Sequence, residues 1–182
     1  MADTSVAPVA RGETFFQGST PDADGGGHLE GLVHAFPDSD PDDVVKRRSG
    51  GNVVCILVRA SVAVTPGQIV VWQAAYHGKR TAAASSVLAE RVAGVVDDHL
   101  PAAGAAVNDL YWLIVRGSAD VVNDGGIAAD SMLFASGTTA GRTILVAAPS
   151  GTQACRTIGT GIATVATTVK GTVHIDIHGG PA

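Results

Sequence analysis

The sequence is poor in charged, aromatic and cysteine residues, and each shortage excludes a class of protein. Its 182 residues include only 16% charged and 4% aromatic residues, and the formal net charge is −5. A negative charge argues against a nucleic-acid partner, because the phosphate backbone rewards clustered Lys and Arg. Two cysteines are too few for a disulfide framework. The longest apolar runs, such as residues 69–72, are far shorter than the ~20 residues that span a bilayer, so we expect no membrane partner.

The residues that are present favour strands over helices. Glutamate and lysine, which usually fill exposed helix faces, are scarce, whereas Val, Thr and Gly are abundant. β-Branched residues suit strands, and glycine suits tight turns. This composition predicts short strands joined by turns.

Residues 1–50 differ from the rest of the chain. Gly, Pro and Asp dominate residues 21–27 and 37–43, as expected for loops and extended chain. The apolar side chains of residues 1–50 occur in clusters too sparse to form a core. We therefore predict an extended N-terminal arm over residues 1–50 that docks on a partner; the alternatives are a disordered terminus or an arm folded over its own domain. The candidate anchors are Phe15, Phe16, Leu29, Leu32, Val33 and Phe36.

Residues 51–182 predict a β domain. β-Branched and aromatic runs indicate strands at 52–61, 68–73, 90–96 and 110–117, the last continuing to 122 beyond a bend. Thr65-Pro66-Gly67 predicts a type II turn, and Lys170-Gly171 predicts a hairpin turn. About nine strands at a spacing of roughly 8–12 residues, without a long helix, indicate an all-β fold, either a small barrel or a sandwich.

The final predicted strand contains the most tempting metal site. His174, Asp176 and His178 alternate with apolar residues and should share one face of the strand. Two imidazoles and a carboxylate could bind a transition metal. The alternative is the polar, solvent-facing side of a half-buried strand. Because same-face neighbours lie ~7 Å apart, three ligands on one ion would require bending, and we expect no cofactor.

An acidic cluster and the basic run that follows it are two further candidates. Asp38, Asp40, Asp42 and Asp43 resemble the start of a calcium loop, but the required Gly and Glu are missing, which favours a solvated acidic turn. The run 46–48 (Lys-Arg-Arg) could pair with that turn or with acidic residues of a partner.

Catalytic groups are equally hard to find. The pair Asp97-Asp98 beside His99 could be an acid–base cluster, but it stands at a strand-to-loop boundary, where solvated Asp is common. Cys55 and Cys155 lie in or beside apolar strands and are expected to be buried small side chains. We therefore do not expect an enzyme.

Residues 47–61, 64–72 and above all 92–122 resemble a group of tailed-phage capsid decoration (cement) proteins, virion proteins encoded among the head genes. The resemblance covers roughly residues 33–122, and the last third of the chain is similar only in its general residue pattern. It implies binding to the outer surface of a virus head, with the major capsid protein and a homotrimer of the chain itself as partners. It also implies that neighbouring capsomers are held together, and we expect the arm to act as a strap. The group has no catalytic residues to transfer.

Two other functions were considered. A receptor- or carbohydrate-binding module of a fibre or spike would need exposed aromatic residues, for which Tyr76 and Trp72 are the candidates. A metal-dependent enzyme would use the His174, Asp176 and His178 set.

Overall fold

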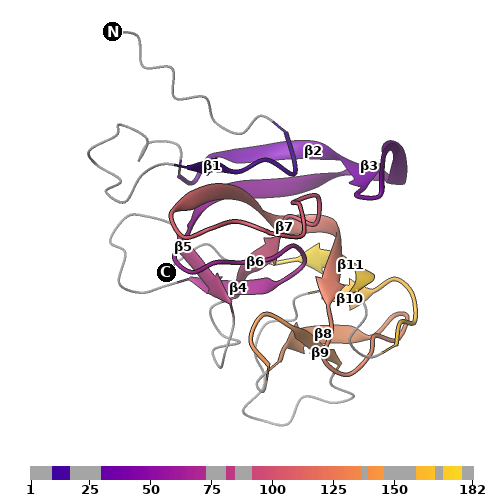
Figure 1. Ribbon diagram of the computed structural model, residues 1–182. Coiled ribbons are helices and arrows are strands. Elements are labelled where there is room, and N and C mark those ends of the chain that lie inside the picture. Colours follow the sequence, from indigo (N-terminus) through magenta and orange to yellow (C-terminus); the bar gives the residue numbers. More distant parts are fainter. Residues whose placement is uncertain are drawn as a thin grey trace, which may run out of the picture.

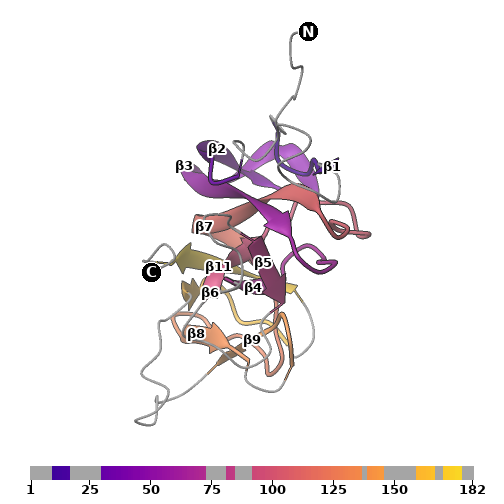
Figure 2. The same ribbon diagram turned by 90° about the vertical axis from the view of Figure 1, so that its left-hand side faces the viewer.

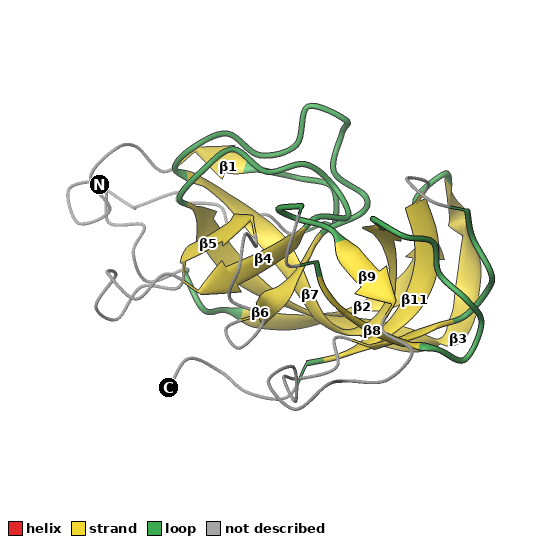
Figure 3. Cartoon of the chain, turned by 90° about the horizontal axis from the view of Figure 1, so that it is seen from below, coloured by secondary structure: helices red, strands yellow, loops and turns green. Residues whose placement is uncertain are grey.

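The computed structural model describes residues 10–16, 30–72, 81–84, 92–136, 139–145, 159–166 and 170–177. All the regular secondary structure within these ranges is β-strand, as Figure 3 shows. This confirms the predicted all-β class. A search of the same residues finds no helix long and apolar enough to cross a membrane.

The strands form one sheet that wraps around itself. They are β1 (Phe15–Phe16), β2 (Val33–Asp40), β3 (Asp43–Ala60), β4 (Ile69–Trp72), β5 (Thr81–Ala84), β6 (Val92–Val96), β7 (Asp109–Val122), β8 (Met132–Ala135), β9 (Thr143–Leu145), β10 (Gly159–Gly161) and β11 (Lys170–Asp176) (Figure 1).

Five of these strands form a closed ring. β3 pairs with β5, β5 with β4, β4 with β6 and β6 with β7, and β7 pairs back with β3. β2 is added beside β3, while β11, β10, β8 and β9 follow in order from β7. β2 and β8 therefore lie toward opposite ends of the molecule, as Figures 1 and 2 show.

Both faces of the two longest strands are buried. Alternate residues of β3 and β7 enter one of two apolar clusters, so neither strand has a consistently polar face along its apolar stretch. This double burial explains why residues 53–58 and 110–115 are continuous apolar runs in the sequence. The first cluster includes Val53, Cys55, Leu57, Leu110, Trp112 and Ile114, and the second includes Ile56, Val58, Ala60, Tyr111 and Leu113.

The expected boundary between an arm and a domain, at residues 50 and 51, falls inside β3. β2 and β3 form a hairpin in which Asp40 pairs with Asp43, leaving a two-residue turn. The acidic, proline-containing segment is therefore a hairpin rather than a free loop. Phe36 is 7% exposed and belongs to the first apolar cluster. Residues 33–50 are thus an integral part of the sheet.

Of the two predicted turns, one is confirmed and the other is wrong. Gly67 has a φ of +81°, and the Gln68 N–H donates to the Thr65 carbonyl at 3.3 Å, as a type II turn requires. Lys170 and Gly171 instead belong to β11, where they pair with β7. A Cβ on Gly171 would lie 2.8 Å from Val165 Cγ2, so this glycine serves close packing rather than a turn.

Tyr111 provides a first testable prediction. Its side chain is fully buried, its hydroxyl has no hydrogen-bond partner among the described residues, and burial raises the pKa of that hydroxyl. An unpaired buried hydroxyl is costly, so Tyr111→Phe should leave the free energy of unfolding unchanged or raise it by up to about 1 kcal/mol. Urea denaturation would measure the change. A loss of stability would show that the hydroxyl does have a partner.

Candidate functional site

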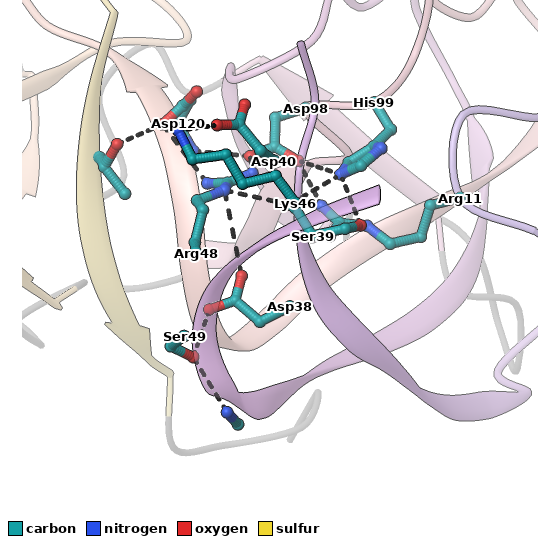
Figure 4. A network of polar contacts seen from close by, with 12 residues as sticks. Arg11, Asp38, Ser39, Asp40, Lys46, Arg48, Ser49, Asp98, His99 and Asp120 are labelled. Atoms are coloured by element: carbon teal, nitrogen blue, oxygen red, sulfur yellow. Dashed lines mark hydrogen bonds and ion pairs between the residues drawn. The ribbon is translucent and has the colours of Figure 1, made fainter. Parts of the chain in front are cut away.

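A network of buried ion pairs connects segments that are far apart in the sequence (Figure 4). It joins the N-terminal segment, the β2–β3 hairpin, the connection between β6 and β7, and β7 itself. Its charged members are Arg11, Asp38, Arg48, Asp97, Asp98 and Asp120.

Arg11 neutralises the acidic pair that follows β6. Its Nε and Nη2 lie 3.0 and 2.9 Å from Asp97 Oδ1, and Nη2 also contacts Asp98 Oδ1. The backbone N–H of Gly12 donates to Asp97 Oδ2 at 2.7 Å. The exposed fraction is 5% for the Arg11 side chain and 0% for both aspartates. The N-terminal segment is thus attached to the domain by charges shielded from water.

Arg48 joins the hairpin to the same acidic pair. Its Nη2 lies 2.6 Å from Asp98 Oδ2, its Nη1 lies 3.4 Å from Asp120 Oδ1, and its Nε lies 4.0 Å from Asp38 Oδ1. Burial alone would lower the pKa of Arg48, but the surrounding carboxylates, Asp98 above all, raise it above the ordinary value. The guanidinium therefore stays charged and holds β2, β3 and β7 together.

These contacts correct two expectations of solvent exposure. Asp97 and Asp98 were expected at a solvated boundary and Asp38 in a solvated turn, but these residues, backbone included, are only 0%, 5% and 1% exposed. The sequence could not show that arginines from distant segments cover them. Of the two partners considered for the basic run 46–48, the acidic turn of the same chain is the one observed, through Arg48–Asp38 and Lys46–Asp40.

His99 is not arranged for proton relay. Its Nε2 lies 3.2 Å from the Ser39 carbonyl oxygen, 3.4 Å from Ser39 Oγ and 3.9 Å from Asp98 Oδ1. A serine–histidine–aspartate triad needs the hydroxyl and the carboxylate on different ring nitrogens. Here both face the same nitrogen, so this geometry supports a structural contact between β2 and the β6–β7 connection.

The three predicted arm anchors whose side chains the structure describes do not form one surface. Phe36 is buried in the core, whereas Leu32 and Val33 are 46% and 56% exposed. Residues 15 and 16 form β1, which pairs with Leu110 and Asp109 of β7. Leu29 lies outside the described residues. Of the alternatives considered for the arm, residues 10–16 thus follow the one in which it folds over its own domain.

The predicted metal ligands are only partly described. His174 is exposed and Asp176 partly buried on β11, while the intervening Val173 and Ile175 are completely buried, so the predicted alternation is confirmed. His178 lies outside the described residues. Within the described ranges, no group of three His, Cys, Asp or Glu side chains could hold a metal ion.

The remaining candidate residues offer little chemistry where they can be seen. Cys55 is completely buried, as predicted, and burial together with the nearby Asp97 raises the pKa of its thiol. Trp72 is partly buried and packs against the second apolar cluster, so it is a poor platform for a sugar. Cys155 and Tyr76 lie outside the described residues.

Sequence reasoning missed the role of Arg11. Arg11 and Asp97 are separated by 86 positions, and no periodic pattern connects them. The signal present in the sequence was that a chain with few charges contains two adjacent aspartates and, far from them, an isolated arginine.

Comparison with known proteins assigns no family. No family model matches the chain, and no curated protein matches it. Among solved structures, the N base of the head fiber gp8.5 of bacteriophage phi29 aligns with a TM-score of 0.43 and 13% sequence identity. That alignment covers 68% of this chain and 93% of the fiber chain. An alignment this weak leaves the family open.

Proposed function

We propose that this protein decorates the outer surface of a tailed-phage capsid, where it binds the major capsid protein and stabilises contacts between neighbouring capsomers. One observation carries the proposal. The sequence that resembles phage decoration proteins covers roughly residues 33–122, and in the structure β2 begins at Val33 and β7 ends at Val122. The resemblance therefore spans the β2–β3 hairpin and the five-stranded ring from the first residue of β2 to the last residue of β7.

The chemistry of the described residues supports a structural role rather than catalysis. Arg11 and Arg48 are committed to ion pairs with buried aspartates, and Cys55 is buried with a raised pKa. Such groups stabilise the fold but are not available to a substrate. We include in the proposal that the protein is not an enzyme and that it acts as a homotrimer.

The proposed contact with the capsid is the exposed apolar surface at the start of β2. Leu32, immediately before β2, and Val33, its first residue, are 46% and 56% exposed, whereas Phe36 further along the strand is buried. Adjacent exposed apolar side chains favour a protein contact, because covering them removes apolar area from water. Leu32 and Val33 are the predicted arm anchors whose described side chains are exposed.

Binding to capsids that lack the protein would test the proposal. The purified chain should saturate such capsids at a fixed ratio to the major capsid protein and raise the temperature at which they burst. Leu32→Asp with Val33→Asp should weaken binding at least tenfold. Met132→Asp is a matched control, because Met132 is 53% exposed but lies on β8, toward the other end of the molecule.

Three results would each contradict a part of this proposal. Failure of the wild-type chain to bind any capsid would remove the decoration function. Equal loss of binding in the Met132→Asp control would remove the contact assigned to β2. Binding without any gain in burst temperature would mean that the protein decorates the capsid but does not cement it.

A further inference from the structure

Residues 10–16, which we call the strap, occupy a specific peptide site on the domain. We call this site the strap seat; it consists of residues 97–99 and the start of β7 at 109–110. Arg11 binds the two aspartates, and Gly12 follows with a φ of +81°. A Cβ on Gly12 would lie 2.6 Å from the His99 carbonyl oxygen, so the seat selects glycine at this position.

The strap seat also recognises backbone. Phe15 and Phe16 form a short strand that pairs with Leu110 and Asp109 of β7. Addition of a strand to a sheet gives affinity through main-chain hydrogen bonds, while the preceding Arg-Gly provides selectivity. The seat is therefore suited to an Arg-Gly segment that continues into an extended backbone paired with β7.

The buried charges strongly favour an occupied seat. Arg11 is the cation that pairs with Asp97, whose side chain is completely shielded from water. Removing one partner of a buried ion pair is strongly destabilising, because the other charge remains without compensation. An Arg-Gly segment, either from the same chain or from a second copy, must therefore fill the seat in the folded protein.

The connection behind the strap is longer than its own seat requires. Leu110 pairs with Phe15 and also with Arg59, and Arg59 Nε lies 2.6 Å from Glu30 Oε1. Phe16 and Glu30, the described residues that flank the connection 17–29, thus both lie in the neighbourhood of Leu110. Paired Cα atoms are about 5 Å apart, so a gap of roughly 15 Å needs about five residues. The thirteen residues present could span on the order of 40 Å.

We propose that the strap seat also takes the strap of a second copy of this chain, so that neighbouring copies exchange residues 10–16. The partner is a second copy because residues 10–16 of every copy carry the Arg-Gly segment that fits the seat. Exchange repeats the same contacts in both arrangements, so it requires no new interface. The inference concerns contacts between copies and does not depend on binding to a capsid.

Disulfide trapping in the full-length chain distinguishes the two arrangements. Phe16→Cys and Asp109→Cys introduce thiols at paired backbone positions, in a chain that also carries Cys155→Ser. Two differently tagged forms would be mixed, unfolded and refolded together, and then oxidised at concentrations from micromolar to millimolar. We expect a reductant-sensitive covalent oligomer that contains both tags and increases with concentration. The single-cysteine variants are the controls and should give at least tenfold less of it.

The opposing results are equally clear. An internally cross-linked monomer at every concentration would overturn the exchange, and so would the absence of any disulfide between these positions. If the double-cysteine variant does not fold, sedimentation of the wild-type chain and Arg11→Ala over the same range provides the second test. The wild-type mass should rise with concentration and the variant should associate at least tenfold more weakly. A constant monomer mass for the wild type would overturn the proposal.

Discussion

Replacement of Arg11 by alanine should lower the free energy of unfolding by about 3–5 kcal/mol, because it removes the cation that pairs with the buried carboxylate of Asp97 and leaves Asp98 with Arg48 alone. The effect is large for a residue so near the N-terminus, and it follows from burial rather than from the number of contacts. Urea denaturation of the full-length variant, followed by circular dichroism, would measure it.

Lys46→Ala is the matched control for this experiment. Lys46 also pairs with an aspartate, Asp40, but its Nζ is 3.7 Å from the carboxylate and its side chain is 69% exposed. Exposed pairs are screened by water, so this substitution should cost at most about 0.5 kcal/mol. Equal losses for the two variants would contradict the role assigned to burial. Adding Asp97→Asn to Arg11→Ala should recover part of the loss, because it removes one uncompensated charge.

Removal of residues 2–50 should abolish folding, whereas removal of residues 2–9 should leave the fold intact. The longer deletion removes Arg11, Arg48 and the core residue Phe36, along with β1, β2 and nearly half of β3. Asp97 and Asp98 would then lack both arginines that neutralise them. The shorter deletion keeps all of these elements.

Circular dichroism and cooperative thermal unfolding would distinguish the two truncated chains. A protein that folds without residues 2–50 would show that the first 50 residues are a separable arm, as the composition suggested. A protein that unfolds after loss of residues 2–9 alone would show that stabilising contacts lie before Ala10. For capsid experiments, point variants on β2 are therefore preferable to deletion of the whole N-terminal region.

The strands could be predicted from the sequence where neighbouring residues carried the signal. The apolar runs at 52–61 and 110–122 were found within β3 and at β7, and the type II turn at Pro66-Gly67 was found because proline and glycine restrict or permit particular backbone angles. The hairpin of β2 and β3 was missed because its turn is rich in Pro and Asp and its strands contain charged residues. Phe36 was interpreted as an anchor for a partner for the same reason.

The candidate site depended on long-range pairing. Asp97-Asp98 and Lys46-Arg47-Arg48 were both noticed as charge clusters, but their separate interpretations could not show that Arg48 and Asp98 meet at 2.6 Å. Arg11 carries no local signal at all. The strap seat becomes visible only when β6, β7 and the N-terminal segment are brought together.

The sequence by itself determined the all-β class and the main apolar strands, because strand propensity and turn chemistry act over a few neighbouring residues. The tertiary structure alone decided which charges are buried, that residues 33–50 belong to the sheet, and that Arg11 pairs with Asp97 and Asp98. These features depend on strand pairing between distant positions. In a low-dielectric interior, that pairing determines whether a charge is compensated or destabilising.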